Sequence, residues 1–550
     1  MELKTKNYET FTVGKTEFQG AANARPALPG DTVYFDGNRV VDVMNRADHT
    51  GLIGVLEMGS NTRYGFTSRG APLYLFTPWN EAYPPFYVAT TNTEYTKNVL
   101  AVVDFENWLP IMNCPRGSCR RIIGECGVLA AESEALLYHV SPKPWRKQLP
   151  PLAPPRAPLN LTVISAANRG VTFHVDPEGC RDIDDAITIR KLAPASYDIR
   201  IHIADVASYI LGNRWLLEAA NRGQTIYKNG RVAAGMFPPS VEEQLSLLPF
   251  HKRRSITMSF KFDDGDIDHI RWVQEEIEVT ESYTYETVKE SDHAFILKDV
   301  ASTLARHELD DPHDWIAQLM LFYNKQAAGI LKRGGIGILR RHSAPDMDRM
   351  ARLEGIEGVP LFIAYSAGEY CAASEENTIH WGISDGQYCH ASSPIRRWAD
   401  CVNQLALLEL SFGCPPIYAH TTDPAQLNRT AKAARAYERD THFIEMILDP
   451  GKRQEVVSGV VIQLNERDVR VWVDAWKRII KAVKPTDGWS FPVKDGVVVE
   501  VSIFYDANRR NWKRKIVFGL TLLADKIEEV DDDMGRCEDE FRRMLNPTPI

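Results

Sequence analysis

The sequence predicts an α+β chain of several domains, in which β-rich modules at the two ends flank a mixed α/β centre. Its 550 residues exceed what one hydrophobic core usually holds, and 44% hydrophobic with 25% charged residues is typical of globular proteins. Short alternating runs separated by turn residues occupy the first part of the chain and the part after residue 455, whereas long helical patterns lie between them. Small β-barrels fit the two ends, and β-sandwiches are an alternative that the pattern does not separate from them.

The N-terminal β-rich part divides into two modules. Its alternating runs are residues 31–35, 51–58, 72–76, 99–108 and 119–129. Because the pattern restarts near residue 100, we expect a first barrel over residues 1–95 and a second, shorter one over residues 96–145.

A proline-rich segment follows. Seven prolines and four basic residues lie between Ser141 and Pro158, which predicts a stiff, extended and basic linker over residues 146–165. A strand-guiding role for its basic residues is the alternative to a plain spacer.

The centre, residues 166–450, carries both strand and helix patterns. Helical patterns occupy residues 315–333, 395–410 and 423–448. The last of these begins with Asp423 as N-cap and Pro424 at the first helical position.

Charge separates the C-terminal part from the rest. The formal net charge of −9 alone argues mildly against a polyanionic partner. However, Gly451 to Leu520 holds 14 basic against 8 acidic residues, and Thr521 to Ile550 holds 9 acidic against 4 basic ones. We therefore expect a basic β-barrel over residues 451–525 and an acidic tail over residues 526–550.

Several features bear on the compartment. Nine cysteines, an odd number spread over the chain, are typical of reduced thiols. No apolar run approaches the ~18–20 residues that span a bilayer, and the N-terminus has no apolar signal core. These features predict a cytoplasmic protein without membrane contact.

The strongest chemical feature is an acidic segment between two apolar strands. Five carboxylates lie within ten residues of HVDPEGCRDIDDAITI (174–189): Asp176, Glu178, Asp182, Asp184 and Asp185. Like charges this close raise one another's pKa unless a cation holds them ionised. Because the ligands are all oxygens, a hard ion is indicated, Mg²⁺ or alternatively Mn²⁺. An acidic surface turn is the competing explanation.

A second feature lies in CHASSPIRRWADC (389–401). Ser393 as N-cap and Pro394 at the first helical position predict a helix whose first turn carries Arg396 and Arg397. Free backbone N–H groups and two guanidinium groups would form a phosphate site there. An arginine pair on a solvated helix face is the alternative. Together with the acidic segment, this feature favours phosphodiester chemistry.

These two segments resemble the signature segments of the ribonuclease II / ribonuclease R (RNB) family, whose members degrade RNA hydrolytically from its 3′ end. Further blocks resemble the family in the same order, over residues 201–210, 222–249, 282–288, 330–346 and 436–440. The resemblance implies cold-shock-like OB barrels at the N-terminus, a central RNB catalytic domain and a C-terminal OB-type barrel.

The resemblance also implies roles for single residues. Asp176, Asp182, Asp184 and Asp185 match the family's four aspartates in type and spacing, which implies that they bind Mg²⁺. Asp182 and Asp184 are expected to act in catalysis with Arg396, which would grip the scissile phosphate. The other expected RNA contacts are Arg397, Tyr227, Tyr285 and Glu438, with Tyr227 stacking on the 3′-terminal nucleotide. A salt bridge within its own helix is the alternative for Glu438.

The resemblance therefore predicts a metal-dependent, processive 3′→5′ exoribonuclease that converts single-stranded RNA to nucleoside 5′-monophosphates. The rivals are a non-catalytic RNA-binding protein that retains the fold and a metal-dependent DNA exonuclease. An RNA-decay complex or a helicase would be a fitting partner, and the sequence leaves the oligomeric state open.

Overall fold

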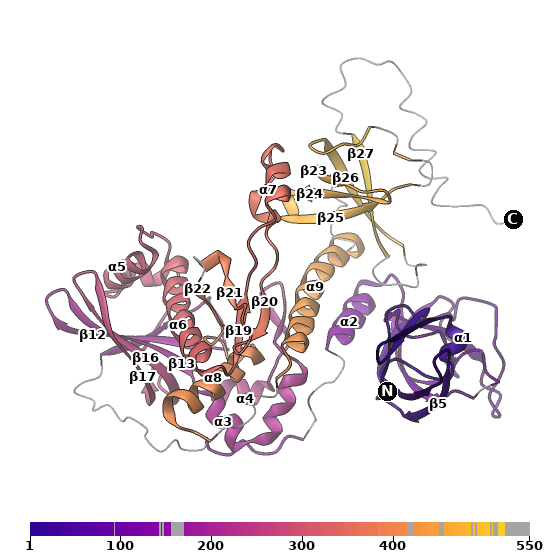
Figure 1. Cartoon of the computed structure of the whole chain (residues 1–550), viewed down its shortest axis with the longest axis horizontal. Helices are drawn as coiled ribbons and strands as arrows, with labels where there is room; N and C mark the ends of the chain where they lie inside the picture. The colour runs from indigo at the N-terminus through magenta and orange to yellow at the C-terminus, as the bar shows by residue number, and fades with distance from the viewer. Residues whose placement is uncertain are drawn as a thin grey trace, which may run out of the picture.

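The computed structural model describes most of the chain. The described residues are 1–92, 94–109, 111–141, 145, 148–155, 170–383, 386–415, 422–449, 456–485, 488–489, 492–506, 509 and 515–522. The expected acidic tail and much of the expected linker lie outside them. In Figure 1 the N-terminal β-rich part lies on one side, the mixed α/β domain on the other, and the C-terminal module above the long helix α9.

The N-terminal part is built from two small β-units and a closed barrel. The small units are a three-stranded sheet of β1 (Leu3–Thr5), β2 (Thr10–Val13) and β3 (Thr16–Gln19), and a hairpin of β4 (Thr32–Phe35) and β5 (Val40–Asn45). The barrel has the strand order β10-β8-β7-β6-β9, and its strands are β6 (Leu52–Leu56), β7 (Leu73–Pro78), β8 (Phe86–Ala89), β9 (Val99–Asn107) and β10 (Arg116–Glu125).

The boundary expected between residues 95 and 96 falls inside this barrel, between β8 and β9. Alternation identifies strands but does not show which strands pair, so a turn within the barrel looked like a boundary between barrels. Leu3 and Phe11 from the small sheet share one hydrophobic core with Phe76 and Phe86 from the barrel. The two parts therefore pack together as one unit.

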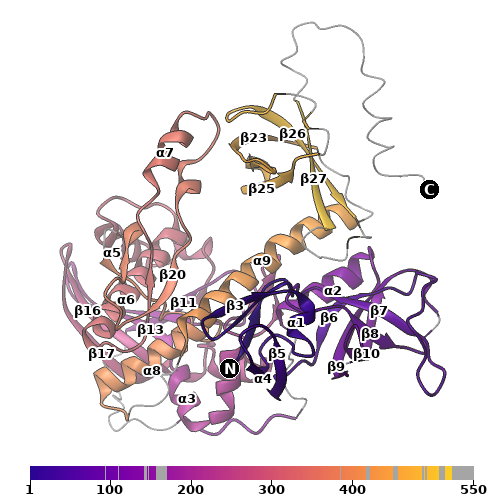
Figure 2. The same cartoon turned by 45° about the vertical axis from the view of Figure 1, so that its right-hand side comes forward.

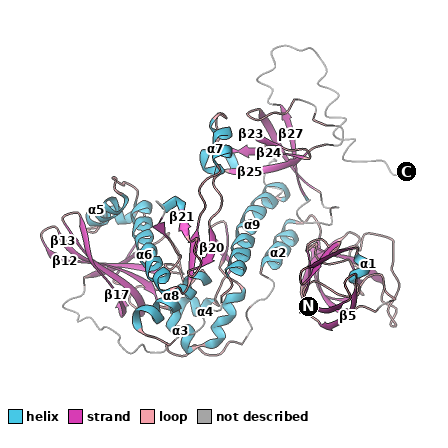
Figure 3. Cartoon of the chain, in the orientation of Figure 1, coloured by secondary structure: helices cyan, strands magenta, loops and turns pink. Residues whose placement is uncertain are grey.

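The mixed domain contains a six-stranded sheet of order β17-β16-β13-β12-β11-β18. Its strands are β11 (Val171–Val175), β12 (Asp185–Ala193), β13 (Ser196–Ala204), β16 (Lys252–Asp263), β17 (Asp266–Glu278) and β18 (Glu281–Tyr283). Its helices include α3 (Val206–Gly212), α5 (Ala294–Ala305), α6 (Pro312–Gly334) and α8 (Trp398–Phe412). Helix α5 packs on α6, and α8 packs on both α6 and α3 (Figures 1 and 3). Ile201 and Met258 pair across two strands and pack into the core that the sheet shares with these helices. On the opposite face His202 is buried between Thr188 and Thr257, at 2.7 and 2.8 Å, so both of its ring nitrogens have hydrogen-bond partners.

Helix α9 (Pro424–Leu448) joins the mixed domain to the C-terminal module. It begins as predicted, because Asp423 accepts a hydrogen bond from the N–H of Ala425 and Pro424 occupies the first turn. Helix α2 (Leu129–Val140) packs beside α9 (Figure 2).

The C-terminal module is an antiparallel sheet of order β25-β24-β23-β26-β27. Its strands are β23 (Val457–Leu464), β24 (Asp468–Val473), β25 (Arg478–Val483), β26 (Val498–Tyr505) and β27 (Ile516–Leu522). The edge strands β25 and β27 approach each other, so the sheet curls toward a barrel. Lys515 of this module donates a 2.9 Å hydrogen bond to Glu132 of α2, and both side chains are fully buried.

An arm extends from the mixed domain to the C-terminal module. It leaves the domain at β19 (Ile338–Arg341), carries α7 (Met347–Glu354) and returns at β20 (Glu369–Ala372). The Phe362 ring in this arm lies 5.9 Å from the ring of Trp472 in β24, and both views show α7 beside the module (Figures 1 and 2). Among the helices in the described part of the chain, none is both long enough and apolar enough to span a membrane.

Candidate active site

The acidic segment forms the connection between β11 and β12 at one end of the six-stranded sheet. Asp176 follows the last residue of β11, and its N–H donates to the carbonyl of Tyr283 in β18 at 3.1 Å. Asp185 is the first residue of β12, and the carbonyl of Asp184 accepts a hydrogen bond from Ala204 at 2.9 Å. Strand pairing therefore fixes both ends of the acidic loop.

Asp184 is the most buried of the four aspartates, with 4% of its surface exposed. Its Oδ1 accepts a 2.8 Å hydrogen bond from the backbone N–H of Ile395, and its Oδ2 lies 3.4 Å from Nε of Arg396. Burial raises the pKa of Asp184 well above its ordinary value, and the guanidinium and the N–H oppose this shift only in part. The Oδ2 atom has no hydrogen-bond partner in the described structure.

Asp185 and Asp176 form a carboxylate pair beside it. Burial and then the Asp176 carboxylate raise the pKa of Asp185 to about 8. Asp176 is held in turn by His174, whose Nδ1 lies 2.9 Å from Oδ2 and whose Nε2 lies 2.8 Å from the hydroxyl of Ser282. Both residues are half-buried, and their carboxylates repel each other when both are ionised.

Asp182 meets the predicted aromatic residue Tyr227. The tyrosine lies on β14 (Ile226–Lys228), and its hydroxyl donates a 2.6 Å hydrogen bond to Oδ2 of Asp182. Burial and then this carboxylate raise the pKa of Tyr227 far above its usual range, so the hydroxyl stays protonated and donates. The fifth carboxylate of the segment, Glu178, is exposed.

The predicted helix start at Ser393 is wrong. Helix α8 begins at Trp398, and Arg396 and Arg397 precede it in a turn. Arg397 is extended, with φ −138° and ψ 126°, because it forms a β-bridge with Gln224. The N–H groups that the helix hypothesis assigned to a phosphate are already used in part, since that of Ile395 binds Asp184.

The turn still presents Arg396 to the acidic loop. Nearly half of this side chain, 45%, is exposed, and one of its terminal nitrogens donates to the Ser393 hydroxyl at 3.1 Å. Burial alone would lower the pKa of Arg396, but Asp184, together with Tyr227 and Asp400, raises it overall. The guanidinium is charged and partly free to meet a phosphate.

Two buried residues that the sequence analysis did not select hold this turn. Asp400 is fully buried and accepts hydrogen bonds from the N–H of Ser393 at 2.7 Å and from Arg397 at 2.9 Å. Asn324 of α6 donates to the Ser392 hydroxyl at 3.0 Å and accepts from the N–H of Ala391 at 2.8 Å. The three-residue spacing from Arg397 to Asp400 was a sequence signal for Asp400. No local sequence pattern indicated Asn324.

The two remaining predicted residues, Tyr285 and Glu438, lie in different places. Tyr285 stacks on His313 with ring centroids 3.8 Å apart, and the carboxylates of Asp185 and Asp176 contribute, after burial, to raising its pKa to about 12. It therefore lies beside the acidic loop. Glu438 is exposed on α9, and its described electrostatic neighbour is Arg478 of β25.

One further carboxylate lies near the loop. Glu242 of helix α4 (Pro239–Leu245) is half-buried, and burial together with the Asp182 carboxylate raises its pKa to about 7. It extends the acidic character of this end of the sheet beyond the four predicted aspartates.

The donor set fits a hard divalent cation in its chemistry. The ligands would be carboxylate oxygens. Among the described residues Oδ2 of Asp184 is buried and has no hydrogen-bond partner, and the carboxylates of Asp176 and Asp185 repel each other. A cation would satisfy the oxygen and relieve the repulsion. In the described residues, no group of three or more acidic, histidine or cysteine side chains is already arranged as a metal site.

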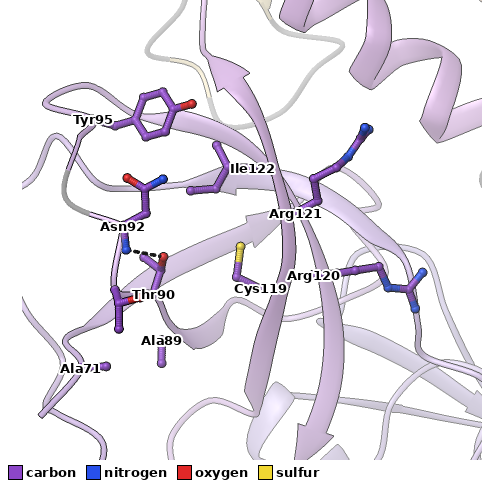
Figure 4. A pocket seen from close by; sticks show the side chains of 10 residues that line it. Ala71, Ala89, Thr90, Asn92, Tyr95, Cys119, Arg120, Arg121 and Ile122 are labelled. Atoms are coloured by element: carbon purple, nitrogen blue, oxygen red, sulfur yellow. Dashed lines mark hydrogen bonds between the residues drawn. The ribbon is translucent and has the colours of Figure 1, made fainter. Parts of the chain in front are cut away.

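A hollow of about 490 Å³ lies elsewhere, on the N-terminal barrel (Figure 4). Thr90, Asn92 and Tyr95 line one side of it, opposite Cys119. The two neighbouring arginines are used in ion pairs, Arg120 with Asp104 and Arg121 with Glu134. No carboxylate is among the residues that line this hollow, so it does not share the chemistry of the acidic loop.

The fold and the acidic loop define a class: a mixed α/β domain with clustered carboxylates, flanked by OB-type β-modules. Family models place the chain within that class. The RNB domain model matches residues 167–294, and the model of the Dis3-like cold-shock domain 2 (CSD2) matches residues 73–141. These matches confirm the resemblance seen in the sequence: residues 167–294 match an RNB domain, and residues 73–141 match a Dis3-like cold-shock domain.

Curated relatives agree with this assignment. The chain is 23% identical over 474 residues to the mouse exosome complex exonuclease RRP44, covering 69% of this chain and 49% of the relative. It is 24% identical over 603 residues to the probable exosome complex exonuclease RRP44 of Caenorhabditis elegans, covering 86% of this chain and 61% of that protein. The chain thus spans about half the length of the first of these relatives.

Solved structures share the fold. RNase R of Mycoplasma genitalium, in complex with ribose-methylated single-stranded RNA, matches with a TM-score of 0.67 at 15% identity over 94% of this chain and 100% of that one. Yeast Ssd1, described as a pseudonuclease, matches with a TM-score of 0.61 at 16% identity over 95% of this chain and 81% of that one.

Proposed function

We propose that this protein is a metal-dependent 3′→5′ exoribonuclease that hydrolyses single-stranded RNA processively to nucleoside 5′-monophosphates. The observation that carries the proposal is the link between the acidic loop and the arginine turn. Asp184 accepts the N–H of Ile395 and lies 3.4 Å from Arg396, so a phosphate held by the arginine lies against the carboxylates. The RNB domain match and the exonuclease names of the relatives support the same activity.

In this proposal Asp176, Asp182, Asp184 and Asp185 hold Mg²⁺, with Mn²⁺ as the alternative. A bound divalent cation lowers the pKa of water and neutralises charge on a phosphate. Arg396 orients the scissile phosphate, and Arg397, paired with Asp400, holds the turn in place. Tyr227 donates its hydroxyl proton to Asp182 and so fixes that carboxylate, leaving its ring to contact the terminal nucleotide. Tyr285 and Glu438 are further proposed RNA contacts, the latter more remote.

The flanking modules would guide RNA to this site. OB-type modules bind single strands through basic grooves and stacked aromatic rings. The proposed domains are the N-terminal OB-type part, the RNB catalytic domain over residues 166–450 and the C-terminal module over residues 451–525. Names of the relatives also suggest an RNA-decay complex as partner, and we propose a cytoplasmic location.

The test is a time course with an end-labelled single-stranded RNA and the full chain. We expect loss of the RNA to mononucleotides with Mg²⁺ and none with EDTA, and we expect Asp184→Asn to be inactive while still binding RNA. Undegraded RNA under every condition would refute the nuclease. Equal degradation of matched DNA would refute the RNA preference.

A non-catalytic RNA-binding protein is the second candidate. Its support is the shared fold with a pseudonuclease and the ion pair that Arg396 forms with Asp184. Retained RNA binding by an unchanged protein that degrades nothing in Mg²⁺ or Mn²⁺ would favour it.

A further inference from the structure

A second group of arginines lies behind the turn that carries Arg396. Arg340 is on β19, and its backbone N–H donates to the carbonyl of Tyr388 at 2.8 Å. Its guanidinium lies 5.3 Å from the centre of the Tyr370 ring and rests against Gly368, where a Cβ would be only 3.0 Å from Nε. The position of this guanidinium is therefore fixed by a ring on one side and by backbone on the other.

Helix α9 brings another arginine to the same place. Asn428 docks the helix onto β20, because it accepts the N–H of Tyr370 at 2.8 Å and donates to its carbonyl at 2.9 Å. Arg435 lies seven residues further along, which is about two turns, and so shares that face of the helix. Electrostatic coupling links Arg435 to both Arg340 and Tyr370.

The positive charge of this group is poorly compensated. Arg397 is coupled to Arg340 and uses the buried carboxylate of Asp400, at 2.9 Å. Within the described residues, neither Arg340 nor Arg435 forms an ion pair with a carboxylate. Burial lowers the pKa of Arg340. Tyr370 opposes this shift, whereas the charges of Arg435 and Arg397 add to it. A desolvated guanidinium without a counter-ion is unfavourable, so the group is suited to an anion.

Two histidines in the neighbourhood respond to the same field. Burial and then Arg397 and Arg340 lower the pKa of His390 well below its ordinary value. Burial, then His342 and Arg340, lower the pKa of His380 to about 4. Both imidazoles are therefore neutral at pH 7, and the charge of the group resides in its arginines.

We propose that Arg340 and Arg435 form a second phosphate-binding position, which holds an RNA backbone phosphate next to the one that Arg396 holds. This inference rests on the proposed function, and it identifies residues that fix the register of the strand. Guanidinium groups from two separate elements can donate to different oxygens of one phosphate. Arg397 is electrostatically coupled to both Arg340 and Arg396, which links this position to the arginine turn.

The test measures RNA binding by fluorescence anisotropy in EDTA, with the full chain, over a series of salt concentrations. Arg435→Gln changes an exposed side chain, and Arg340→Gln changes the half-buried one. We expect each to weaken binding about tenfold and to reduce the slope of log affinity against log salt by about 0.7, the value for one phosphate contact on a single strand. Arg429→Gln is the matched control, because Arg429 is exposed on another face of α9 and pairs with Asp423.

The phosphate at this position belongs either to the RNA backbone or to a nucleoside 5′-monophosphate product. Competition by a nucleoside 5′-monophosphate separates these two sources. Weaker monophosphate binding with an unchanged RNA slope would assign the position to product and overturn our assignment. Equal slopes in the two variants, the control and the unchanged protein would overturn this inference alone. Absence of RNA binding by the unchanged protein would overturn the proposed function and this inference with it. Because Arg435 is exposed, its variant keeps the test valid even if Arg340→Gln unfolds.

Discussion

Replacing Asp400 by asparagine tests whether the arginine turn depends on one buried ion pair. Asparagine keeps an oxygen for the N–H of Ser393, which lies 2.7 Å from Oδ1, but it removes the charge that faces Arg397. Breaking a buried ion pair leaves an uncompensated charge and typically costs about 3–5 kcal/mol. We therefore expect Asp400→Asn to lower the free energy of unfolding by that amount, and the rate of RNA hydrolysis to fall because the turn carrying Arg396 loses its anchor.

Urea unfolding and RNA hydrolysis of four proteins give the assay. They are the unchanged chain, Asp400→Asn, Arg397→Gln and the double variant, which together form a double-mutant cycle. If the pair is coupled, the double variant loses less stability than the two single losses added together, since neither charge is then left alone. Strict additivity, or an Asp400→Asn protein with unchanged stability and activity, would refute the reasoning.

Three further outcomes are expected. Asp184→Asn should abolish hydrolysis without lowering the urea midpoint of the metal-free protein. Its Oδ1 still accepts the Ile395 N–H and a buried charge is gone, so a lower midpoint would contradict this. Tyr227→Phe should slow hydrolysis roughly tenfold and leave RNA affinity unchanged. The substitution keeps the ring but removes the 2.6 Å hydrogen bond to Asp182, which is worth about 1.5–3 kcal/mol. An unchanged rate would exclude a role of the Tyr227 hydroxyl in positioning Asp182. Adding Mg²⁺ should raise the thermal midpoint of the unchanged protein, since the cation would relieve the charge repulsion in the acidic loop; an identical shift in Asp184→Asn would show that the ion binds elsewhere.

The outcome at two helix starts shows what local sequence can predict. Asp423 caps α9 and Pro424 is its first residue, so this helix begins where the local signal predicts. Ser393 and Pro394 carry the same local signal, yet α8 begins at Trp398. Residues distant in the sequence, among them Asp184, take the backbone groups of this turn, and local pattern cannot show that.

The domain limits and the site show the same contrast between local sequence signals and contacts made by residues distant in the sequence. Alternation predicted β4, β6, β7, β9 and β10 in the N-terminal part but not β1, β2, β3, β5 and β8, and it did not show the pairing that closes one barrel across residue 95. The four aspartates and Arg396 stood out through type and spacing. Asn324 supports the turn from another helix, α6. Its role could be identified only from the structure, in which α6 lies beside the turn.

The buried pair of Glu132 and Lys515 has a consequence for the order in which the chain acquires its structure. The two residues are 383 positions apart, and both are fully buried in the finished fold. During synthesis α2 emerges long before its partner strand, so Glu132 must stay hydrated until the C-terminal module has been made. The final burial of α2 is therefore a late event, and the last strands to be translated complete a contact that the first third of the molecule has left open.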